Sequence, residues 1–347
     1  MSDKQEKNRI HSLKIIQMKN DQITKDVLKI DPEEEVDKIC TRMREMLAKV
    51  LRRRGLVVAL SGGIDSSVTT ALAARAVGPE RTVALLMPER HSADDTLSLS
   101  TAVADHFGVV KIHENISGIL TSLGFYRRYD DAVKTVIHSY GDGWKSKIVI
   151  PNVVDGKGLN FFSIVAQSPD GDTIKKRLPL NAYLEIVAAT NFKQRTRKML
   201  EYYHADRLNY AVAGTPNRLE YDQGFFVKLG DGAADLKPIA HLYKTQVYQL
   251  AEFLGVPENI RKRPPTTDTY SLPQGQDEFY FSLPHEQMDI CLYAKNNDIP
   301  VETVAERLGL TIEQVKRVYD DIEQKRRSTR YLHLKPLMIE DIAEIKN

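Results

Sequence analysis

The chain has 347 residues, of which 42% are hydrophobic and 28% charged, as in an ordinary globular protein of one large or two modest domains. The formal net charge of +2 is too small to favour nucleic acid or an anionic membrane as a partner. Cys40 and Cys291 are too few for a zinc site or a disulfide framework, and no segment resembles a signal peptide or a membrane span, so we predict a cytoplasmic protein.

Residues 1–30 are polar and predict an extension outside the folded domain. Asp31-Pro32-Glu33-Glu34 has the residues that begin a helix, with Asp as the N-cap and Pro at the first helical position. Apolar residues at helical spacing over 36–51 predict one buried helix face. Arg52-Arg53-Arg54 then ends the helix with positive charge, and we interpret the triplet as a solvated helix end rather than a nucleic-acid contact.

Residues 55–77, GLVVALSGGIDSSVTTALAARAV, predict a strand, a glycine loop and a helix in immediate succession. Residues 57–60 suit a buried parallel strand. Gly62 and Gly63 let the backbone approach a bound group, and the unpaired amides of the loop and first helical turn favour an anion such as phosphate. Asp65 would repel phosphate directly, so its presence predicts a divalent metal ion between the carboxylate and the phosphate.

The next elements continue the βαβ pattern of a parallel sheet, with a buried strand at 82–88, a helix at 95–106 and a strand at 108–112. Ligands of such sheets bind beyond the carboxyl ends of the strands, where residues 61–66 and 88–94 fall. We therefore predict an α/β fold with a Rossmann-like, doubly wound parallel sheet.

Residues 126–185 interrupt this alternation. Apolar runs at 147–150 and 161–165 predict strands, while the Gly- and Asp-rich stretches 155–158 and 169–172 predict turns. We interpret the region as a β-rich insertion or flap over the sheet, and no motif within it indicates a reaction.

Further along, the sequence predicts a helix at 191–203, a short strand at 210–214, and a helix that ends at Gly255 before Pro257. Between the last two elements lies a loop, residues 224–235, that is dense in Gly, Asp and Lys.

The C-terminal part predicts a helical segment. Residues 298–319 are similar to a DNA-binding helix-turn-helix, but Lys316 and Arg317 are the only bases of the second helix, which favours a plain pair of amphipathic helices. The basic stretch 325–330 has two interpretations, nucleic-acid binding or a mobile segment that folds over a phosphate-rich site. Residues 331–347 are expected to form a tail.

Five motifs beside the loop SGGIDS resemble, in order and spacing, those of the NAD synthetases, a branch of the ATP pyrophosphatases. They are NFKQRTR (191–197), GTPNRLE (214–220), GFFVKLGDGAAD (224–235), PIAHLYKTQV (238–247) and PPTTD (264–268). The loop alone is shared with GMP, asparagine and argininosuccinate synthetases and with tRNA thiolases. The resemblance covers roughly residues 31–125 and 186–330 and implies one adenine nucleotide α-hydrolase-like domain over 31–330.

The resemblance implies an amide ligase that converts deamido-NAD and ammonia to NAD through an adenylated intermediate, releasing AMP and pyrophosphate. ATP would be the co-substrate and Mg²⁺ the cofactor. Such chemistry needs positioning and charge neutralisation but no protein nucleophile, in agreement with the carboxylates, lysines and loop amides of the motifs.

The resemblance also assigns roles residue by residue. Asp65 and Glu220 would hold Mg²⁺, and Asp65 and Lys244 would be the catalytic residues, with Lys244 neutralising phosphate charge. Deamido-NAD would contact Arg195, Lys228 and Asp235, and Lys325 would close over it. ATP would be bound by Ala59, Leu60, Ser61, Gly62, Gly63, Ile64, Asp65, Ser66, Met87, Thr215, Lys244 and Thr266.

The chain departs from the family pattern at several positions, most of them where the acid would bind. Gln194 and Thr267 stand where the family has Ala, Thr269 where it has an apolar residue, and Gln324 where it has His; Leu99-Ser100 replaces an Asp-Ala pair. A related ligase that acts on another nucleotide-like or secondary-metabolite acid is therefore the alternative.

The resemblance implies a homodimer, with the 31–54 helix as one possible contact. Glutamine-using members carry an additional hydrolase domain, for which 347 residues leave no room, so we expect free ammonia or a separate glutamine amidotransferase as the nitrogen source. A tRNA thiolase is disfavoured because it would need paired reactive cysteines and a basic RNA surface. Neither nucleic acid nor membrane is expected as a partner.

Overall fold

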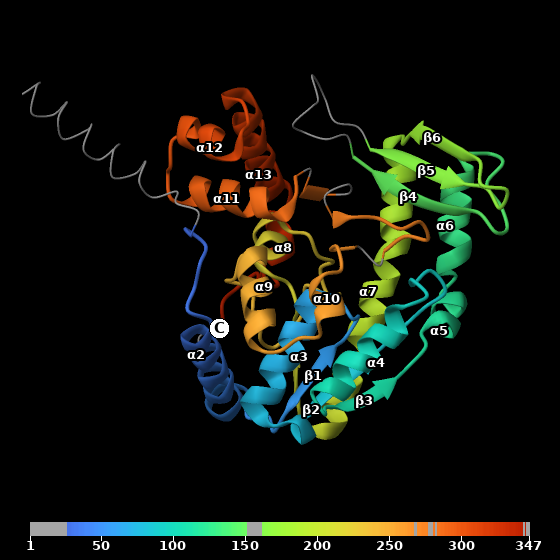
Figure 1. Cartoon of the computed structure of the whole chain (residues 1–347). Helices are drawn as coiled ribbons and strands as arrows, with labels where there is room; N and C mark the ends of the chain where they lie inside the picture. Colours follow the sequence, from blue (N-terminus) through green and yellow to red (C-terminus); the bar gives the residue numbers. More distant parts are fainter. Residues whose placement is uncertain are drawn as a thin grey trace, which may run out of the picture.

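Four short strands form a parallel sheet in the order β3-β2-β1-β7, of which β1, β2 and β3 are labelled in Figure 1. The computed structural model describes residues 26–150, 162–266, 269–276, 280–281, 283–342 and 344. Within it, the strands are β1 (Leu56–Ala59), β2 (Thr82–Leu86), β3 (Val110–His113) and β7 (Ala211–Ala213). Leu56 of β1 pairs with Thr82 on one side and with Ala211 on the other. All three strands predicted around the glycine loop and the one predicted at 210–214 are confirmed.

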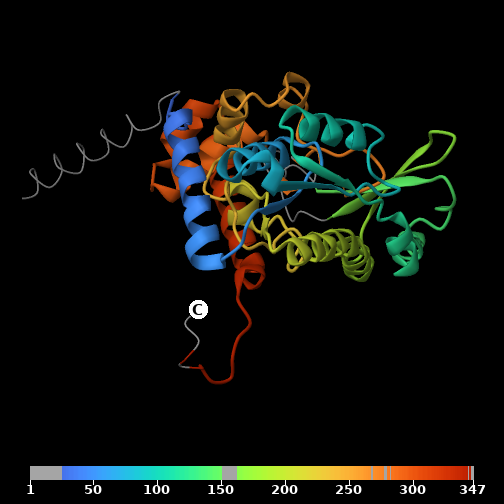
Figure 2. The same ribbon diagram turned by 90° about the horizontal axis from the view of Figure 1, so that it is seen from below.

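Helices cover both faces of this sheet, because its side chains alternate between two apolar cores. Leu56 and Val58 face one core, whereas Val57 faces the other. The first core is completed by α2 (Pro32–Glu45), α3 (Ile64–Val77), α4 (Thr96–His106), α9 (Lys244–Phe253) and α10 (Glu258–Arg261). The second is completed by α5 (Ser117–Ser122), α6 (Phe125–Lys134) and α7 (Leu180–Leu208) (Figure 2). The predicted doubly wound α/β fold is confirmed.

The helix start at Asp31 is also confirmed. Its Oδ1 accepts hydrogen bonds from the backbone N–H groups of Glu33 (3.0 Å) and Glu34 (3.1 Å). The last turn widens into a π-helical segment, η1 (Met46–Leu51), and Arg52 then leaves the helix with a φ of 52°. A short 3₁₀ turn, η2 (Pro79–Arg81), precedes β2.

The region 126–185 is only partly β-rich. It begins within α6 and continues as an antiparallel sheet of β4 (Lys145–Val149), β5 (Ser163–Gln167) and β6 (Thr173–Arg177), which lies beside α6 and α7 (Figure 1). The turn at 169–172 is confirmed by the bond from Ser168 N to Asp172 O (2.9 Å). Residues 151–161, with the turn expected at 155–158, lie outside the described residues. The predicted start of the following helix at 191 is wrong, because α7 begins directly after Pro179, a favoured residue at helix starts.

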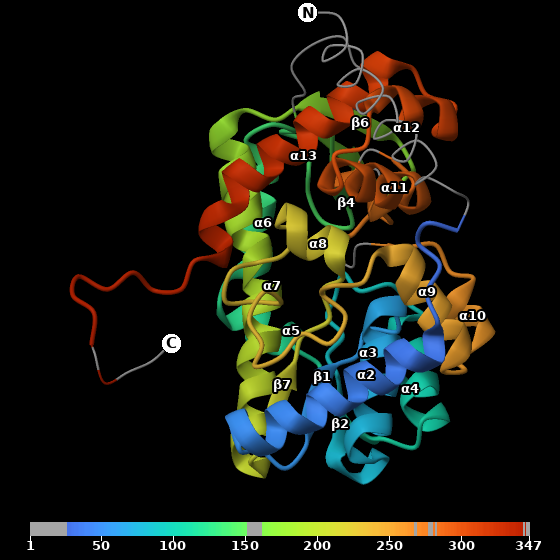
Figure 3. The same cartoon turned by 90° about the vertical axis from the view of Figure 1, so that its left-hand side faces the viewer.

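Three C-terminal helices share a third apolar core with α8 (Arg218–Gln223) at one end of the molecule (Figure 3). They are α11 (His285–Asn296), α12 (Val301–Leu308) and α13 (Ile312–His333). The amphipathic helix pair predicted over 298–319 is confirmed. The interpretation of 325–330 as a mobile segment is wrong, because these residues belong to α13, where Ile322 and Lys325 are buried. No helix among the described residues is both long and apolar enough to cross a bilayer.

Candidate functional site

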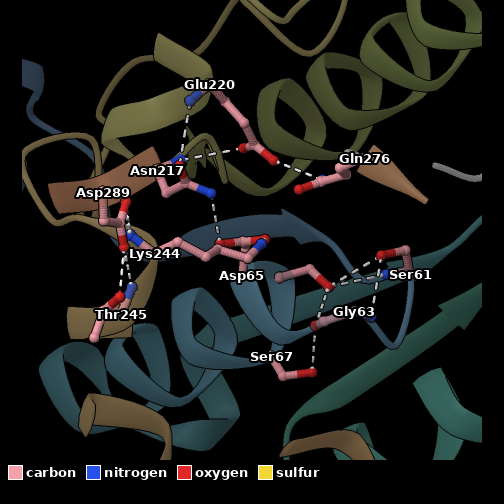
Figure 4. A network of polar contacts seen from close by, with 11 residues as sticks. Ser61, Gly63, Asp65, Ser67, Asn217, Glu220, Lys244, Thr245, Gln276 and Asp289 are labelled. Atoms are coloured by element: carbon pink, nitrogen blue, oxygen red, sulfur yellow. Dashed lines mark hydrogen bonds and ion pairs between the residues drawn. The ribbon is translucent and has the colours of Figure 1, made fainter. Parts of the chain in front are cut away.

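The glycine loop connects β1 to α3 at the carboxyl edge of the sheet. Gly62 has a φ of +79°, and a Cβ there would lie 2.8 Å from the Cβ of Leu99, so no other residue fits without strain. Ser61 Oγ accepts a hydrogen bond from Gly63 N (3.3 Å), and Ser66 Oγ donates one to Gly63 O (3.0 Å) (Figure 4). Gly63 has no side chain to cap the N-terminus of α3. The loop is therefore held in one shape while the helix end stays suited to an anion.

Asp65, in the first turn of α3, is the centre of a polar cluster (Figure 4). Its Oδ1 accepts a hydrogen bond from Asn217 Nδ2 (3.0 Å), and its Oδ2 forms an ion pair with Lys244 Nζ. Asn217 is the N-cap of α8 and makes a capping box with Glu220, with bonds of 3.2 Å in both directions. Three distant segments thus converge on one carboxylate.

Electrostatics within this cluster favour a further cation. Burial and the neighbouring Asp65 carboxylate raise the pKa of Glu220 well above its ordinary value. Burial alone would lower the pKa of Lys244, but the Asp65 and Glu220 carboxylates outweigh it and raise that pKa. Lys244 is only 1% exposed, so its charge acts inside the protein rather than in solvent.

The donor set of this cluster suits Mg²⁺. Two hard carboxylates, Asp65 and Glu220, lie around one lysine, and cations of this type take one or two protein carboxylates and complete their shell with phosphate and water. No group of three or more His, Cys, Asp or Glu side chains with metal-site geometry occurs among the residues that the structure describes. The residues therefore fit an ion held jointly by protein and substrate rather than a closed protein cage.

Asp289 of α11 holds the backbone of Lys244 in position. Its carboxylate accepts hydrogen bonds from Lys244 N (3.2 Å), Thr245 N (2.6 Å) and Thr245 Oγ1 (2.6 Å), and thereby caps the N-terminus of α9. Burial raises the pKa of Asp289 to about 6. No local pattern in the sequence indicates this contact, because the N-terminus of a helix is rarely capped from another helix far along the chain.

A cavity of about 1030 Å³ opens beside the cluster. Its walls come from the glycine loop, from α7, from the insertion and from residues within 260–266 and 269–276. All of the predicted ATP-binding and metal-binding positions line it, namely Ala59, Leu60, Ser61, Gly62, Gly63, Ile64, Asp65, Ser66, Met87, Thr215, Glu220, Lys244 and Thr266.

The four predicted deamido-NAD contacts do not line this cavity. Arg195 is exposed on α7, and its Nε donates a hydrogen bond to Lys228 O (3.3 Å). Lys228 Nζ in turn donates to the carbonyl groups of Tyr331 (2.8 Å) and Leu334 (3.2 Å) at the end of α13.

Asp235 and Lys325 both have structural contacts. Asp235 Oδ2 accepts a hydrogen bond from Val212 N (2.7 Å) on β7. Lys325 is buried in α13 and forms an ion pair with Asp321 (2.6 Å), while burial lowers its pKa. A lysine held in this way does not form a lid over the cavity in this structure.

Only some of the residues that depart from the NAD synthetase motifs line the cavity. Gln194, Thr269 and Ser100 line the cavity, whereas Gln324 lies on α13 and Thr267 is outside the described residues.

A buried ion pair, absent from the predictions, lies beside the cavity, which Lys193 lines. Lys193 Nζ contacts Glu89 Oε1 (2.6 Å) and donates a hydrogen bond to Thr269 O (2.8 Å). It thereby ties α7 to the segment after the PPTTD motif. No spacing pattern in the sequence connects these three positions.

A second missed contact reaches the carboxylate cluster from the 269–276 segment. Gln276 Nε2 donates a hydrogen bond to Glu220 Oε1 (2.9 Å). This bond lowers the pKa of Glu220, but burial and the Asp65 charge raise it by more.

Comparison with known proteins places this site in a family. The family model described as NAD synthase matches residues 35–138 and 167–331. A protein of Rhizobium meliloti called NH(3)-dependent NAD(+) synthetase is 57% identical over 321 residues, which cover 92% of this chain and 96% of that one. A protein of Mesorhizobium japonicum with the same name is 56% identical over 318 residues, covering 92% of this chain and all of its own.

Solved structures share the fold at lower identity. An NH3-dependent NAD synthetase from Campylobacter jejuni superposes with a TM-score of 0.58 at 21% identity, covering 90% of this chain and 100% of that chain. An NMN synthetase from Francisella tularensis superposes with a TM-score of 0.59 at 20% identity, covering 89% and 99%. Both neighbours therefore share the fold of this chain over nearly its whole length.

Proposed function

This chain belongs to the NAD synthase family, and on that basis we propose that it makes NAD from deamido-NAD, ATP and ammonia. An oxygen of the acid's carboxylate attacks the α-phosphorus of ATP, and the bond from that phosphorus to the pyrophosphate oxygen breaks. Ammonia then attacks the acyl-adenylate carbon, AMP leaves, and a proton is lost from nitrogen. The observation that carries this proposal is the convergence of the glycine loop with Asp65, Glu220 and Lys244 in one cavity.

ATP binding is assigned to the wall of the cavity at the carboxyl ends of β1 and β2. The loop amides between Ser61 and Ser66 suit the pyrophosphate part of ATP. Met87, Thr215 and Thr266 line the same cavity. Lys244, fully buried and positively charged, lowers the cost of collecting phosphate charge in a low-dielectric site.

Asp65 and Glu220 are the residues that would hold Mg²⁺. When bound, the ion withdraws charge from the phosphate oxygens and makes pyrophosphate a better leaving group. In the structure, Lys244 and Asn217 satisfy Asp65, and Gln276 satisfies one oxygen of Glu220. These neighbours hold the two carboxyl groups close together.

The identity of the acid rests on close relatives and not on the fold. Relatives that are 55–57% identical are called NH(3)-dependent NAD(+) synthetases, whereas a structure of the same fold at 20% identity is called an NMN synthetase. A fold that carries both names does not select an acid. The high identity over nearly the whole chain favours deamido-NAD and disfavours the alternative acid.

We further propose a homodimer that forms through α7. Four large apolar side chains on this helix are exposed, namely Leu180 (69%), Leu184 (53%), Met199 (57%) and Tyr203 (59%). Leu180 and Leu184 lie one helical turn apart, as do Met199 and Tyr203, and about four turns separate the two pairs. The four side chains form a broad apolar stripe of the kind that marks a protein interface. By contrast, the exposed side of α2 is rich in charged residues that pair with one another.

Two of the residues predicted to contact the acid, Arg195 and Lys228, lie beside this apolar stripe. Arg195 lies on the same face of α7 as Met199, one turn away, and contacts the Lys228 loop. We propose that Arg195 and Lys228 reach the acid bound by the partner subunit. Contacts of Asp235 and Lys325 with the acid stay predictions, as does the cytoplasmic location.

One assay tests the reaction. The purified protein is incubated with ATP, Mg²⁺ and ammonium, with and without deamido-NAD, and NAD, AMP and pyrophosphate are quantified. Equal amounts of the three products, dependent on deamido-NAD, support the proposal. ATP binding without NAD formation would mean that the acid is a different one. Replacement of ammonium by glutamine, expected to give no NAD, tests the need for ammonia or a separate amidotransferase.

A further inference from the structure

One wall of the cavity comes from a segment that the NAD synthase model leaves out. The model matches up to residue 138 and resumes at 167. Between these points, residues 140–145 and Phe162 line the cavity. The insertion therefore contributes residues to the wall of the cavity.

This wall is aromatic. The ring of Trp144 lies 5.9 Å from that of Tyr140, centroid to centroid, and Phe162 stacks on Tyr183 of α7 at 4.3 Å. Trp144, Phe162 and Tyr183 are only half-buried, so each packs against the second core with one side and lines the cavity with another. Half-exposed aromatic faces in a cavity are suited to stack on a flat ring.

The aromatic wall is held in place from beneath. Ser146 Oγ contacts the hydroxyl groups of Tyr140 (3.1 Å) and Tyr129 (2.9 Å), all of them buried. This network orients Tyr140, against which Trp144 packs.

Strand β4, which contains Ser146, also bonds to the segment 269–276, which reaches the carboxylate cluster. Ser146 N donates to Ser271 Oγ (2.9 Å), and Leu272 N donates to Ser146 O (3.2 Å). A few residues later, Gln276 bonds to Glu220. The aromatic wall and the proposed metal carboxylate are therefore parts of one connected unit.

We propose that Trp144, supported by the buried Tyr140, forms a stacking surface for a heteroaromatic ring of the dinucleotide acid. This inference rests on the proposed function, which assigns the loop end of the cavity to ATP and leaves the insertion end for the second substrate. Stacking needs no particular hydrogen-bond pattern, so the surface binds the ring by its face while polar contacts elsewhere select the carboxylate.

Trp144 provides a direct measurement, because it is the only tryptophan in the sequence. Its fluorescence is followed while deamido-NAD and ATP are titrated separately into the wild-type protein. Saturable quenching by deamido-NAD is expected. Quenching by ATP alone, or no response to either substrate in a protein that forms NAD, would overturn the inference.

Kinetics of three variants complete the test. Trp144→Ala should raise the KM for deamido-NAD by about tenfold and leave the KM for ATP unchanged, whereas Trp144→Phe should stay near wild type. Phe253→Ala, which alters an exposed aromatic residue outside the cavity, is the control and should change neither KM. An unchanged KM for deamido-NAD in Trp144→Ala would refute the stacking surface alone, whereas a wild-type protein that makes no NAD would refute the proposed function.

Discussion

The ammonium group of Lys244 lies on the carboxylate of Asp65, although 179 positions separate the two residues in the chain. The lysine begins α9 and the aspartate lies in the first turn of α3, so the pair joins the starts of two helices that pack on the same face of the sheet. A buried ion pair of this kind contributes little net stability but holds both charges at fixed positions. The proposed chemistry needs those positions.

Asp65→Ala should reduce Mg²⁺-dependent pyrophosphate release by at least about 100-fold, because it removes the proposed metal ligand and the partner of Lys244. Circular dichroism should still show a folded protein. Asp105→Ala, at an exposed ion pair with Lys111, is the control and should keep wild-type activity. Full pyrophosphate release in Asp65→Ala would sink the metal assignment.

The affinity for Mg²⁺ should depend on pH through Glu220. Its pKa is raised by burial and by Asp65, so below that raised pKa a proton competes with the ion. Apparent Mg²⁺ affinity, measured by titration at several pH values, should fall by up to about tenfold per pH unit on acidification. Glu220→Gln should bind Mg²⁺ weakly, with a flatter pH dependence. An equal pH dependence in both proteins would contradict this assignment.

The raised pKa of Glu220 also predicts how the stability of the ligand-free protein changes with pH. The folded state keeps the Glu220 proton at pH values where the unfolded chain has lost it. Stability should therefore decline as the pH rises from the ordinary glutamate pKa through the raised one. Thermal unfolding at several pH values checks this, and the decline should be smaller in Glu220→Gln.

Asp289→Ala should destabilise the protein by about 1–3 kcal/mol, because it leaves the buried N–H groups of Lys244 and Thr245 without their acceptor. Activity should fall as well, since the start of α9 positions Lys244. Urea unfolding and the NAD assay measure the two effects. Asp289→Asn, which keeps an acceptor oxygen, should recover part of both. Asp320→Ala, on the exposed side of α13, is the control.

Lys228→Ala should raise the KM for deamido-NAD more than the KM for ATP, because Lys228 lies outside the cavity that the proposed ATP-binding positions line. A small loss of stability is also expected, since Lys228 bonds to two carbonyl groups at the end of α13. Separate substrate titrations distinguish these effects. If ATP affinity falls instead, the assignment of Lys228 to the acid is incorrect.

Leu184→Glu should convert the dimer to a monomer, because it puts a charge in the exposed apolar stripe of α7. Light scattering after size exclusion gives the mass. Activity should fall with the dimer, since Arg195 and Lys228 would then lose the partner's cavity. Val50→Glu, at a side chain 72% exposed just after α2, is the control for the other candidate contact. A dimer that survives Leu184→Glu but not Val50→Glu would move the interface to α2.

Local patterns in the sequence predicted the glycine loop and its flanking elements. The alternation of short apolar strands with helices is a repeated local signal, and the Gly62-Gly63 pair has a backbone reason that holds in any fold. The start of α2 at Asp31 is equally local. The basic stretch 325–330 was misread because a charged helix face and a mobile segment have similar compositions.

The carboxylate cluster was predicted in part. Asp65, Glu220 and Lys244 belong to sequence motifs, which can be found from the order of residues along the chain alone. Asn217, Asp289 and Gln276 do not stand out in the same way, because each acts through one hydrogen bond whose partner is far away in sequence. The Glu89–Lys193 pair is similar, since only the packing of α7 against the sheet brings the two side chains together.

By itself, the sequence determined the fold class, the glycine loop and the motifs of the NAD synthase family, since these depend on residue spacing within one or two elements. Only the tertiary structure decided that the insertion lines the cavity, that Lys325 is buried in α13, and that Arg195 is exposed on α7. The reason is physical. The spacing of residues determines which side chains lie on one face of a helix or strand. The packing of helices and strands determines which other residues that face contacts.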